Sequence, residues 1–99
     1  MIFVTFLKWT TQGARTPQDA AKRAQGARAL AEKLGGKILS TYVVTAGDCN
    51  VVAIADMPNG DAMAKLAAAV MASGNAIVTV ARGLTPEEYA KLASEIPAP

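Results

Sequence analysis

Cys49 is the one side chain in this sequence that could act as a soft nucleophile. It lies in the short loop 46–50, between two strand-like segments, directly after the tight-turn pair Gly47-Asp48. Because the thiolate form of cysteine is strongly nucleophilic, Cys49 is the candidate catalytic residue. The alternative interpretation is that Cys49 is a small apolar side chain packed beside a turn, as free cysteines usually are.

The sequence contains no histidine. This excludes Ser-His-Asp and Cys-His pairs as well as histidine metal ligands, and a single thiol without imidazole is a poor zinc site. We therefore expect no metal site and no cofactor. An enzyme built from this chain would use Cys49, or a lysine or carboxylate whose pKa is shifted by a hydrophobic pocket.

A second set of candidate residues follows the first predicted strand. Lys8 and Trp9 are expected beside the N-termini of the two main helices, where exposed amide groups favour an anion. With added charge from Arg15, Lys22 and Arg23, this end would bind a carboxylate ligand with an apolar body. The alternative is that Lys8 and Trp9 cover a dimer edge while Lys22 and Arg23 are solvated.

The remaining candidates depend on strand direction. The first and third strands are expected to be parallel, so Cys49 and Arg82 are expected at one end of the sheet, roughly 10 Å apart, with the helix C-termini. Arg82 would then favour a thiolate or bind an anionic group. Tyr42, together with Met63 and Met71, is expected to line a pocket between the sheet and the helices.

Hydrophobic periodicity and turn residues define the elements that must position these side chains. Strands are predicted at residues 2–9, 37–45, 50–57 and 77–81. Helices are predicted to start at Thr16-Pro17, near 58–61, and at Thr85-Pro86, with Thr16 and Thr85 as N-caps, and residues 10–15 are read as a loop. This order predicts an α+β, ferredoxin-like βαββαβ fold with a short C-terminal helix and sheet order 4-1-3-2. Residues 1–96 form one domain and 97–99 a frayed tail.

Both faces of the predicted strands are apolar, which indicates a partner. The first strand places Ile2, Val4 and Phe6 on one face and further apolar side chains on the other. Two helices cover only one face of a four-stranded sheet, so the other face needs a second layer. We expect a homodimer, or a larger homo-oligomer, in which two sheets face each other as a dimeric α/β barrel.

Composition limits the other classes of partner. The chain has 99 residues, of which 52% are hydrophobic and 18% charged, and a net charge of +2. This is typical of a single globular domain and gives no reason to expect nucleic acid. No segment reaches membrane-spanning length, no signal peptide is recognised, and one cysteine fits a reducing compartment. We expect a cytoplasmic protein without a membrane partner.

Several short motifs resemble those of the GYD-domain family, small bacterial and archaeal proteins with a dimeric α/β-barrel fold. The motifs are Thr11-Gln12-Gly13, residues 29–37, residues 51–54, Gly74-Asn75 and residues 82–85. The family's Gly-Tyr-Asp signature is altered here, because Cys49 stands at the tyrosine position and Asn50 at the aspartate position. Asn50 is for this reason a candidate ligand-binding residue, beside Lys8, Trp9, Tyr42 and Arg82.

The resemblance implies a barrel that serves unrelated functions in its relatives, among them cofactor-independent oxygenases, isomerases and small-molecule binders. Three functions remain open. The first is a small-molecule-binding or accessory protein, favoured by apolar pockets and scarce catalytic groups, with a small anionic or apolar ligand. The second is a cofactor-independent enzyme that uses Cys49 or a pocket lysine or carboxylate. The third is an assembly protein, favoured by the alanine-rich face of the second helix.

Overall fold

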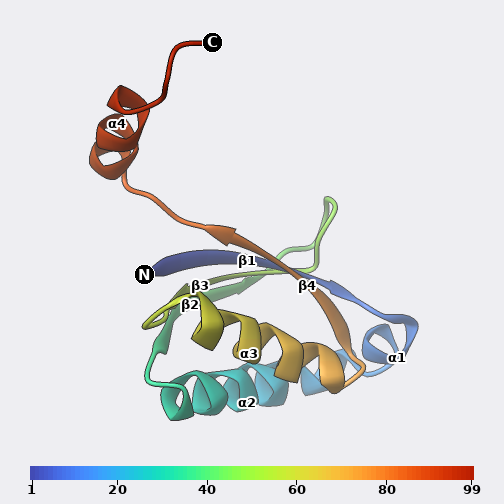
Figure 1. Cartoon of the computed structure of the whole chain (residues 1–99). Helices are drawn as coiled ribbons and strands as arrows, with labels where there is room; N and C mark the ends of the chain where they lie inside the picture. Colours follow the sequence, from blue (N-terminus) through green and yellow to red (C-terminus); the bar gives the residue numbers. More distant parts are fainter.

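The computed structural model describes residues 1–99. Four strands and five helical segments follow one another along the chain (Figure 1). They are β1 (Ile2–Trp9), α1 (Thr11–Ala14), the 3-10 helix η1 (Pro17–Asp19), α2 (Ala20–Lys33), β2 (Lys37–Val43), β3 (Val51–Asp56), α3 (Gly60–Ala72), β4 (Ala76–Arg82) and α4 (Pro86–Ser94).

The strands form a single sheet in the order β2-β3-β1-β4, which is the predicted order read from the other edge. Every neighbouring pair is antiparallel. The molecule is therefore an α+β protein with a four-stranded antiparallel sheet, and this arrangement is compatible with a ferredoxin-like fold.

The expected parallel alignment of β1 and β3 is wrong. In the sheet Leu7 pairs with Val51 and Ile2 pairs with Asp56, so these two strands run in opposite directions. The reason is connectivity: the α2 crossover returns the chain parallel to β1 in β2, and the following hairpin then reverses it in β3. The start of β3 consequently lies at the end of β1.

The placement of the helix ends changes with this correction. Helix α2 begins at the Trp9 end of the sheet, but α3 ends there rather than beginning there. The Thr10 N–H donates to the Asn75 carbonyl at 3.0 Å, and the Thr10 hydroxyl donates to the Gly74 carbonyl at 2.6 Å. The expectation that both helix N-termini meet beside Lys8 and Trp9 is therefore wrong.

Of the two predicted threonine caps, one forms. Thr85 and Glu88 make a complete capping box at the start of α4. The Thr85 N–H donates to the Glu88 carboxylate at 3.0 Å, and the Glu88 N–H donates to the Thr85 hydroxyl at 3.1 Å. Thr16 makes no side-chain cap, and its hydroxyl instead accepts a hydrogen bond from Arg23. The predicted loop 10–15 contains the short helix α1, which Thr10 caps.

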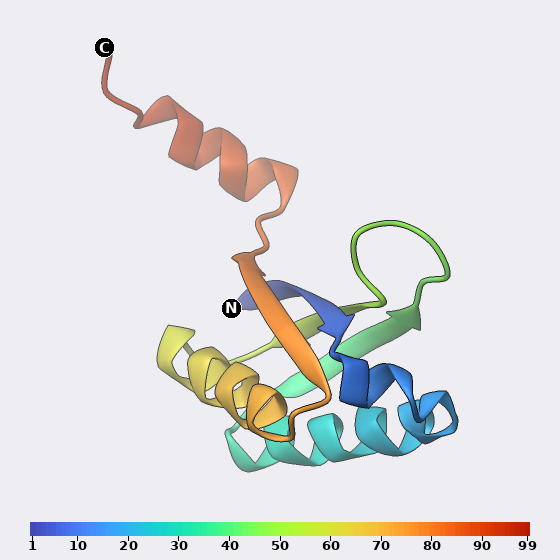
Figure 2. The same ribbon diagram turned by 90° about the vertical axis from the view of Figure 1, so that its right-hand side faces the viewer.

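Helices α2 and α3 lie side by side on one face of the sheet, and no helix covers the other face (Figures 1 and 2). The core fills the space between the two layers at the Met57 end of the sheet. Its largest members are Phe3, Met57, Met63 and Leu66, all at most 7% exposed. Alternation along β1 places Phe3 and Thr5 inside, while Ile2, Val4 and Phe6 lie on the uncovered face.

Helix α4 stands apart from this two-layer body. It extends beyond the end of β4 on the side of the uncovered sheet face (Figure 2). The radius of gyration of 15.0 Å exceeds the value of about 13 Å that is usual for 100 residues. The exposed apolar side chains Tyr89, Leu92 and Ile96 of this C-terminal region have no cover within the chain.

Candidate functional site

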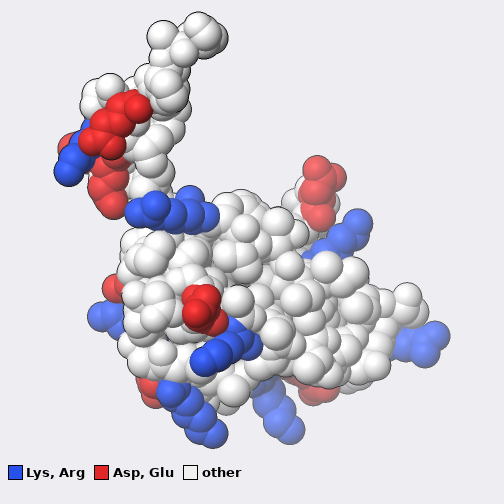
Figure 3. Space-filling view, viewed as in Figure 1, with Lys and Arg blue, Asp and Glu red and all other residues white.

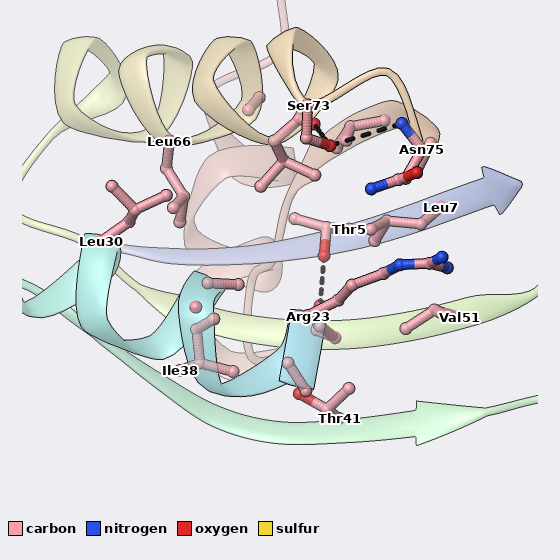
Figure 4. A pocket seen from close by; sticks show the side chains of 18 of the residues that line it. Thr5, Leu7, Arg23, Leu30, Ile38, Thr41, Val51, Leu66, Ser73 and Asn75 are labelled. Carbon is pink, nitrogen blue, oxygen red and sulfur yellow. Dashed lines mark hydrogen bonds between the residues drawn. The ribbon is translucent and has the colours of Figure 1, made fainter. Parts of the chain in front are cut away.

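A cavity of about 450 Å³ separates the sheet from helices α2 and α3 (Figure 4). Its lining is predominantly apolar and comes from all four strands and both helices. The strands contribute Thr5, Leu7, Trp9, Ile38, Thr41, Val43, Val51, Ala53, Ala55, Ala76 and Val78, and the helices contribute Ala20, Arg23, Ala24, Gly26, Ala27, Leu30, Met63, Leu66, Ala67, Ala69 and Val70. Ser73 and Asn75, between α3 and β4, complete it.

Small side chains explain why this space is hollow. Helix α2 turns Ala20, Ala24 and Ala27 toward the sheet, and the facing position of β3 is Ala53. Methyl groups at facing positions of two layers cannot meet across the usual separation of about 10 Å, so a gap remains. At one end of the gap larger side chains, including Leu30 and Leu66, approach each other (Figure 4).

Arg23 is the only charged side chain in the lining. It extends along the cavity toward the end where Asn75 lies (Figure 4). Its Nη1 donates to the Gly13 carbonyl at 3.1 Å, and its Nη2 donates to the Thr16 carbonyl at 3.2 Å and to the Thr16 hydroxyl. The guanidinium carbon lies 5.2 Å from the centroid of the Trp9 ring, within cation–π range. Arg23 is therefore held in place by neutral groups.

Asn75 provides a second polar group at the same end. Its side-chain oxygen accepts a hydrogen bond from Gln12 Nε2 at 3.1 Å, and its carbonyl accepts from the Thr10 N–H. These bonds join α1 to the turn between α3 and β4. The side-chain nitrogen of Asn75 donates to no protein group, so it is available to a ligand, whereas its backbone N–H donates to the Ser73 hydroxyl.

The structure separates Trp9 from Lys8. Trp9 lines the cavity beneath Arg23, whereas Lys8 points to the uncovered face because successive strand residues alternate. Of the expected anion site, Trp9 and Arg23 therefore lie together at the cavity, and Lys8 lies outside it.

Two hydrogen bonds of Asn50 hold the β2–β3 loop against β1. Its side-chain oxygen accepts a hydrogen bond from the Trp9 N–H at 2.9 Å, and its own N–H donates to the Leu7 carbonyl at 2.8 Å. These two bonds continue the β1–β3 pairing one step past the strand. Asn50 thus supports the cavity through Leu7 and Trp9 without lining it.

Cys49 and Arg82 lie at opposite ends of the sheet, so the predicted pairing of these residues is wrong. Arg82 pairs with Phe3, near the start of β1. Cys49 lies in the β2–β3 loop, which the bond between Asn50 and Trp9 holds at the end of β1. The cause is the antiparallel alignment of β1 and β3. Cys49 is half-buried, has no disulfide partner and does not line the cavity.

Of the three side chains expected to line a pocket against the helices, only Met63 does so. Tyr42 is opposite Val52 on the uncovered face and is 67% exposed. Met71 points to solvent from α3 and is 42% exposed. The expectation is therefore wrong for Tyr42 and Met71.

The sequence left two interpretations of Arg23 open, as part of an anion site or as a solvated side chain. It gave Asn75 only within the Gly74-Asn75 motif and not as a site residue. A signal for Arg23 was present: it follows Ala20 by three positions and precedes Ala27 by four, which puts it on the inward face of the helix. Asn75 lies in a turn, where no periodicity predicts side-chain direction.

The chain has neither a cluster of metal-ligating side chains nor a membrane-spanning helix. No three His, Cys, Asp or Glu side chains are grouped so that they could hold a metal ion. No helix has the length and apolar character needed to cross a membrane.

Comparison with known families matches residues 3–93 to the GYD domain. The matched region includes the sheet apart from Ile2, α2, α3 and nearly all of α4, and it contains every residue that lines the cavity. No curated protein matches the chain.

Proposed function

Since the chain belongs to the GYD domain family and this membership assigns no ligand, we propose from the geometry that the protein binds a small, largely apolar molecule between its sheet and its helices. The cavity carries this proposal. Its volume of about 450 Å³ lies within the range of about 300–1,000 Å³ that is usual for ligand pockets. Its walls are apolar, with a few polar groups collected at one end.

Trp9 provides a direct test, because it is the only tryptophan and it lines the cavity. We expect 1-decanol, titrated below its solubility limit, to change the intensity and emission maximum of Trp9 in a saturable manner. Ala27→Phe fills the cavity and should abolish saturable binding. Ala29→Phe, an exposed position on the same helix, is the matched control and should bind as the unmodified protein does. Equal binding by the two variants would contradict the proposal.

Binding is favoured over catalysis by the titratable groups of the lining. Arg23 is the only one, and a guanidinium stays protonated at all relevant pH values, so the lining supplies a charge but no general base. An enzyme of the alternative type would have to use Cys49, from a loop outside the cavity. Cys49→Ser is the discriminating variant in an activity screen: loss of a turnover would favour this alternative.

We also propose that the protein is a homodimer, formed through the uncovered sheet face. The accessible surface of the single chain is 6586 Å², whereas a monomer of this mass usually exposes about 5,300 Å². The excess of roughly 1,300 Å² is more than the 800 Å² that each partner buries in a standard interface. A second copy is the simplest cover for such a face.

The residues of the uncovered face support this assembly. The apolar side chains Ile2, Val4, Phe6, Val52, Ile54 and Ile77 lie together on it, with Tyr42 at its edge. Helix α4 extends on the same side of the sheet (Figures 1 and 2), so its apolar residues would lie beside a second copy. Exposed Ala64, Ala68 and Ala72 of α3 are the feature that favours an assembly larger than a dimer.

Light scattering coupled to gel filtration tests the dimer. We expect twice the chain mass of 10.2 kDa at micromolar concentration. Phe6→Glu places a charge in the middle of the uncovered face and should give monomers, whereas Arg28→Glu, on the exposed side of α2, should leave the mass unchanged. A monomer before any substitution would refute the proposal, and a higher mass would favour the larger assembly.

Two further expectations rest on charge and on cysteine content. Lys, Arg, Asp and Glu are interspersed on the face seen in Figure 3, without a broad patch of one sign, which supports a protein without a nucleic-acid partner. A single cysteine without a disulfide partner supports a cytoplasmic location.

A further inference from the structure

The charge on Arg23 has no counterpart in the protein. The one ion pair in the chain joins the amino group of Met1 to Asp56 at 3.2 Å, at the opposite end of the sheet. All oxygens that contact Arg23 belong to Gly13 and Thr16 and are neutral. No carboxylate lines the cavity. Arg23 thus presents an uncompensated positive charge within an otherwise apolar lining.

From this arrangement we propose that the natural ligand is an anionic amphiphile, a molecule with one carboxylate head group and an apolar body, and that Arg23 binds the head group. This inference rests on the proposed function, since it names the class of molecule that the cavity holds. The head group would lie at the Arg23 and Asn75 end, and the apolar body would point toward Leu30 and Leu66 (Figure 4).

The unused hydrogen-bonding groups at this end fit an acceptor such as a carboxylate. A guanidinium has five N–H groups, and three of those of Arg23 donate to Gly13 and Thr16. Two remain without a protein acceptor, as do both N–H groups of the Asn75 amide. Donors therefore collect at this end, where the oxygens of Gly13, Thr16 and the Asn75 side chain already accept hydrogen bonds.

Arg23 is also pre-organised for such a contact. Its bonds to the backbone of Gly13 and Thr16 and its position over the Trp9 ring fix the side chain before a ligand arrives. An arginine held in this way loses little conformational freedom on binding, which strengthens a charge-assisted hydrogen bond. A solvated surface arginine would have neither the contacts nor the apolar surroundings.

Three probes with the same ten-carbon chain test this inference through the fluorescence of Trp9: decanoate, 1-decanol and decylamine, each below its aggregation concentration at neutral pH. We expect decanoate to bind about tenfold more tightly than decanol, the size of one charge-assisted hydrogen bond, and decylamine to bind more weakly than both. Arg23→Gln should remove the preference for decanoate, and Arg23→Lys should retain part of it. Arg28→Gln, an exposed position on the same helix, is the matched control and should keep it.

The outcomes separate this inference from the proposed function. If decanol binds but decanoate binds no more tightly, the anionic ligand class is wrong and the apolar site stands. If none of the three probes binds, the proposed function fails. The comparison of probes on the unmodified protein remains decisive even if Arg23→Gln is poorly folded. A preference for decanoate that persists in a folded Arg23→Gln protein would overturn the role of Arg23.

Discussion

Replacing Gly13 by alanine tests how the end of the cavity is built. Gly13 lies in α1 directly against the backbone of Asn75. A Cβ atom at this position would lie 2.9 Å from the carbonyl carbon of Asn75 and closer still to its oxygen. The obstacle is backbone, which cannot rotate away as a flexible side chain would, so α1 and the α3–β4 turn must separate.

The cost follows from the contacts that this separation breaks. Overpacking of a tight site costs about 1–3 kcal/mol. The Thr10 bonds to Asn75 and Gly74 add about 0.5–1.5 kcal/mol each if they are lost. We therefore expect Gly13→Ala to lower the free energy of unfolding by about 2–6 kcal/mol, a large part of the stability of a small domain.

Urea unfolding followed by circular dichroism measures this change. With a slope of about 1.5 kcal/mol/M, the midpoint should fall by roughly 1.3–4 M. The variants are compared at one protein concentration, because the midpoint of a dimer depends on it. Gly26→Ala is the matched control: nothing lies within 4 Å of the added methyl group, so removing a mid-helix glycine should stabilise by about 0.5–1 kcal/mol. A loss below about 1 kcal/mol for Gly13→Ala would refute the reasoning.

Three further predictions concern α4 and the β2–β3 loop. Hydrogen bonds from Thr85 hold the pKa of Glu88 below its ordinary value of 4.5. The cap therefore stabilises α4 above that pH, and this stabilisation is lost as the pH falls through the lowered pKa. Backbone chemical shifts should show α4 fraying in acid, and Glu88→Gln should weaken this pH dependence. Asn50→Ala leaves the Trp9 N–H without its side-chain acceptor and should cost about 1–2 kcal/mol in urea unfolding, whereas Asn50→Asp, which keeps an acceptor, should cost less. Cys49→Ser should leave decanol binding unchanged, because Cys49 does not line the cavity; a several-fold loss would place the loop in the site.

Local patterns predicted most of the elements. Strand-like runs such as residues 2–9, turn residues and the Thr85 cap correctly predicted four strands, three main helices and the strand order. The Thr16 cap failed because a competing partner, Arg23, takes its hydroxyl, and such a partner is invisible in a local motif.

The error in strand direction had a different origin. A crossover followed by a hairpin already implies that β1 and β3 are antiparallel, so the connectivity in the sequence contradicts the expected parallel pair. The strand direction decides at which end of the sheet each candidate residue lies. This one error therefore placed Cys49 beside Arg82 and separated Cys49 from Trp9.

The sequence by itself determined which residues share a face of each strand and helix, because side-chain direction repeats with the period of the element. It also determined family membership, which residues 3–93 establish. Only the tertiary structure decided that a cavity lies between the layers and that Arg23 stands in it, held by Gly13 and Thr16. The size of that space depends on the summed volumes of side chains from four strands and two helices, and the position of Arg23 depends on Trp9 of β1 and on the carbonyls of Gly13 and Thr16, where Gly13 lies against Asn75. Neither quantity is a property of any one segment.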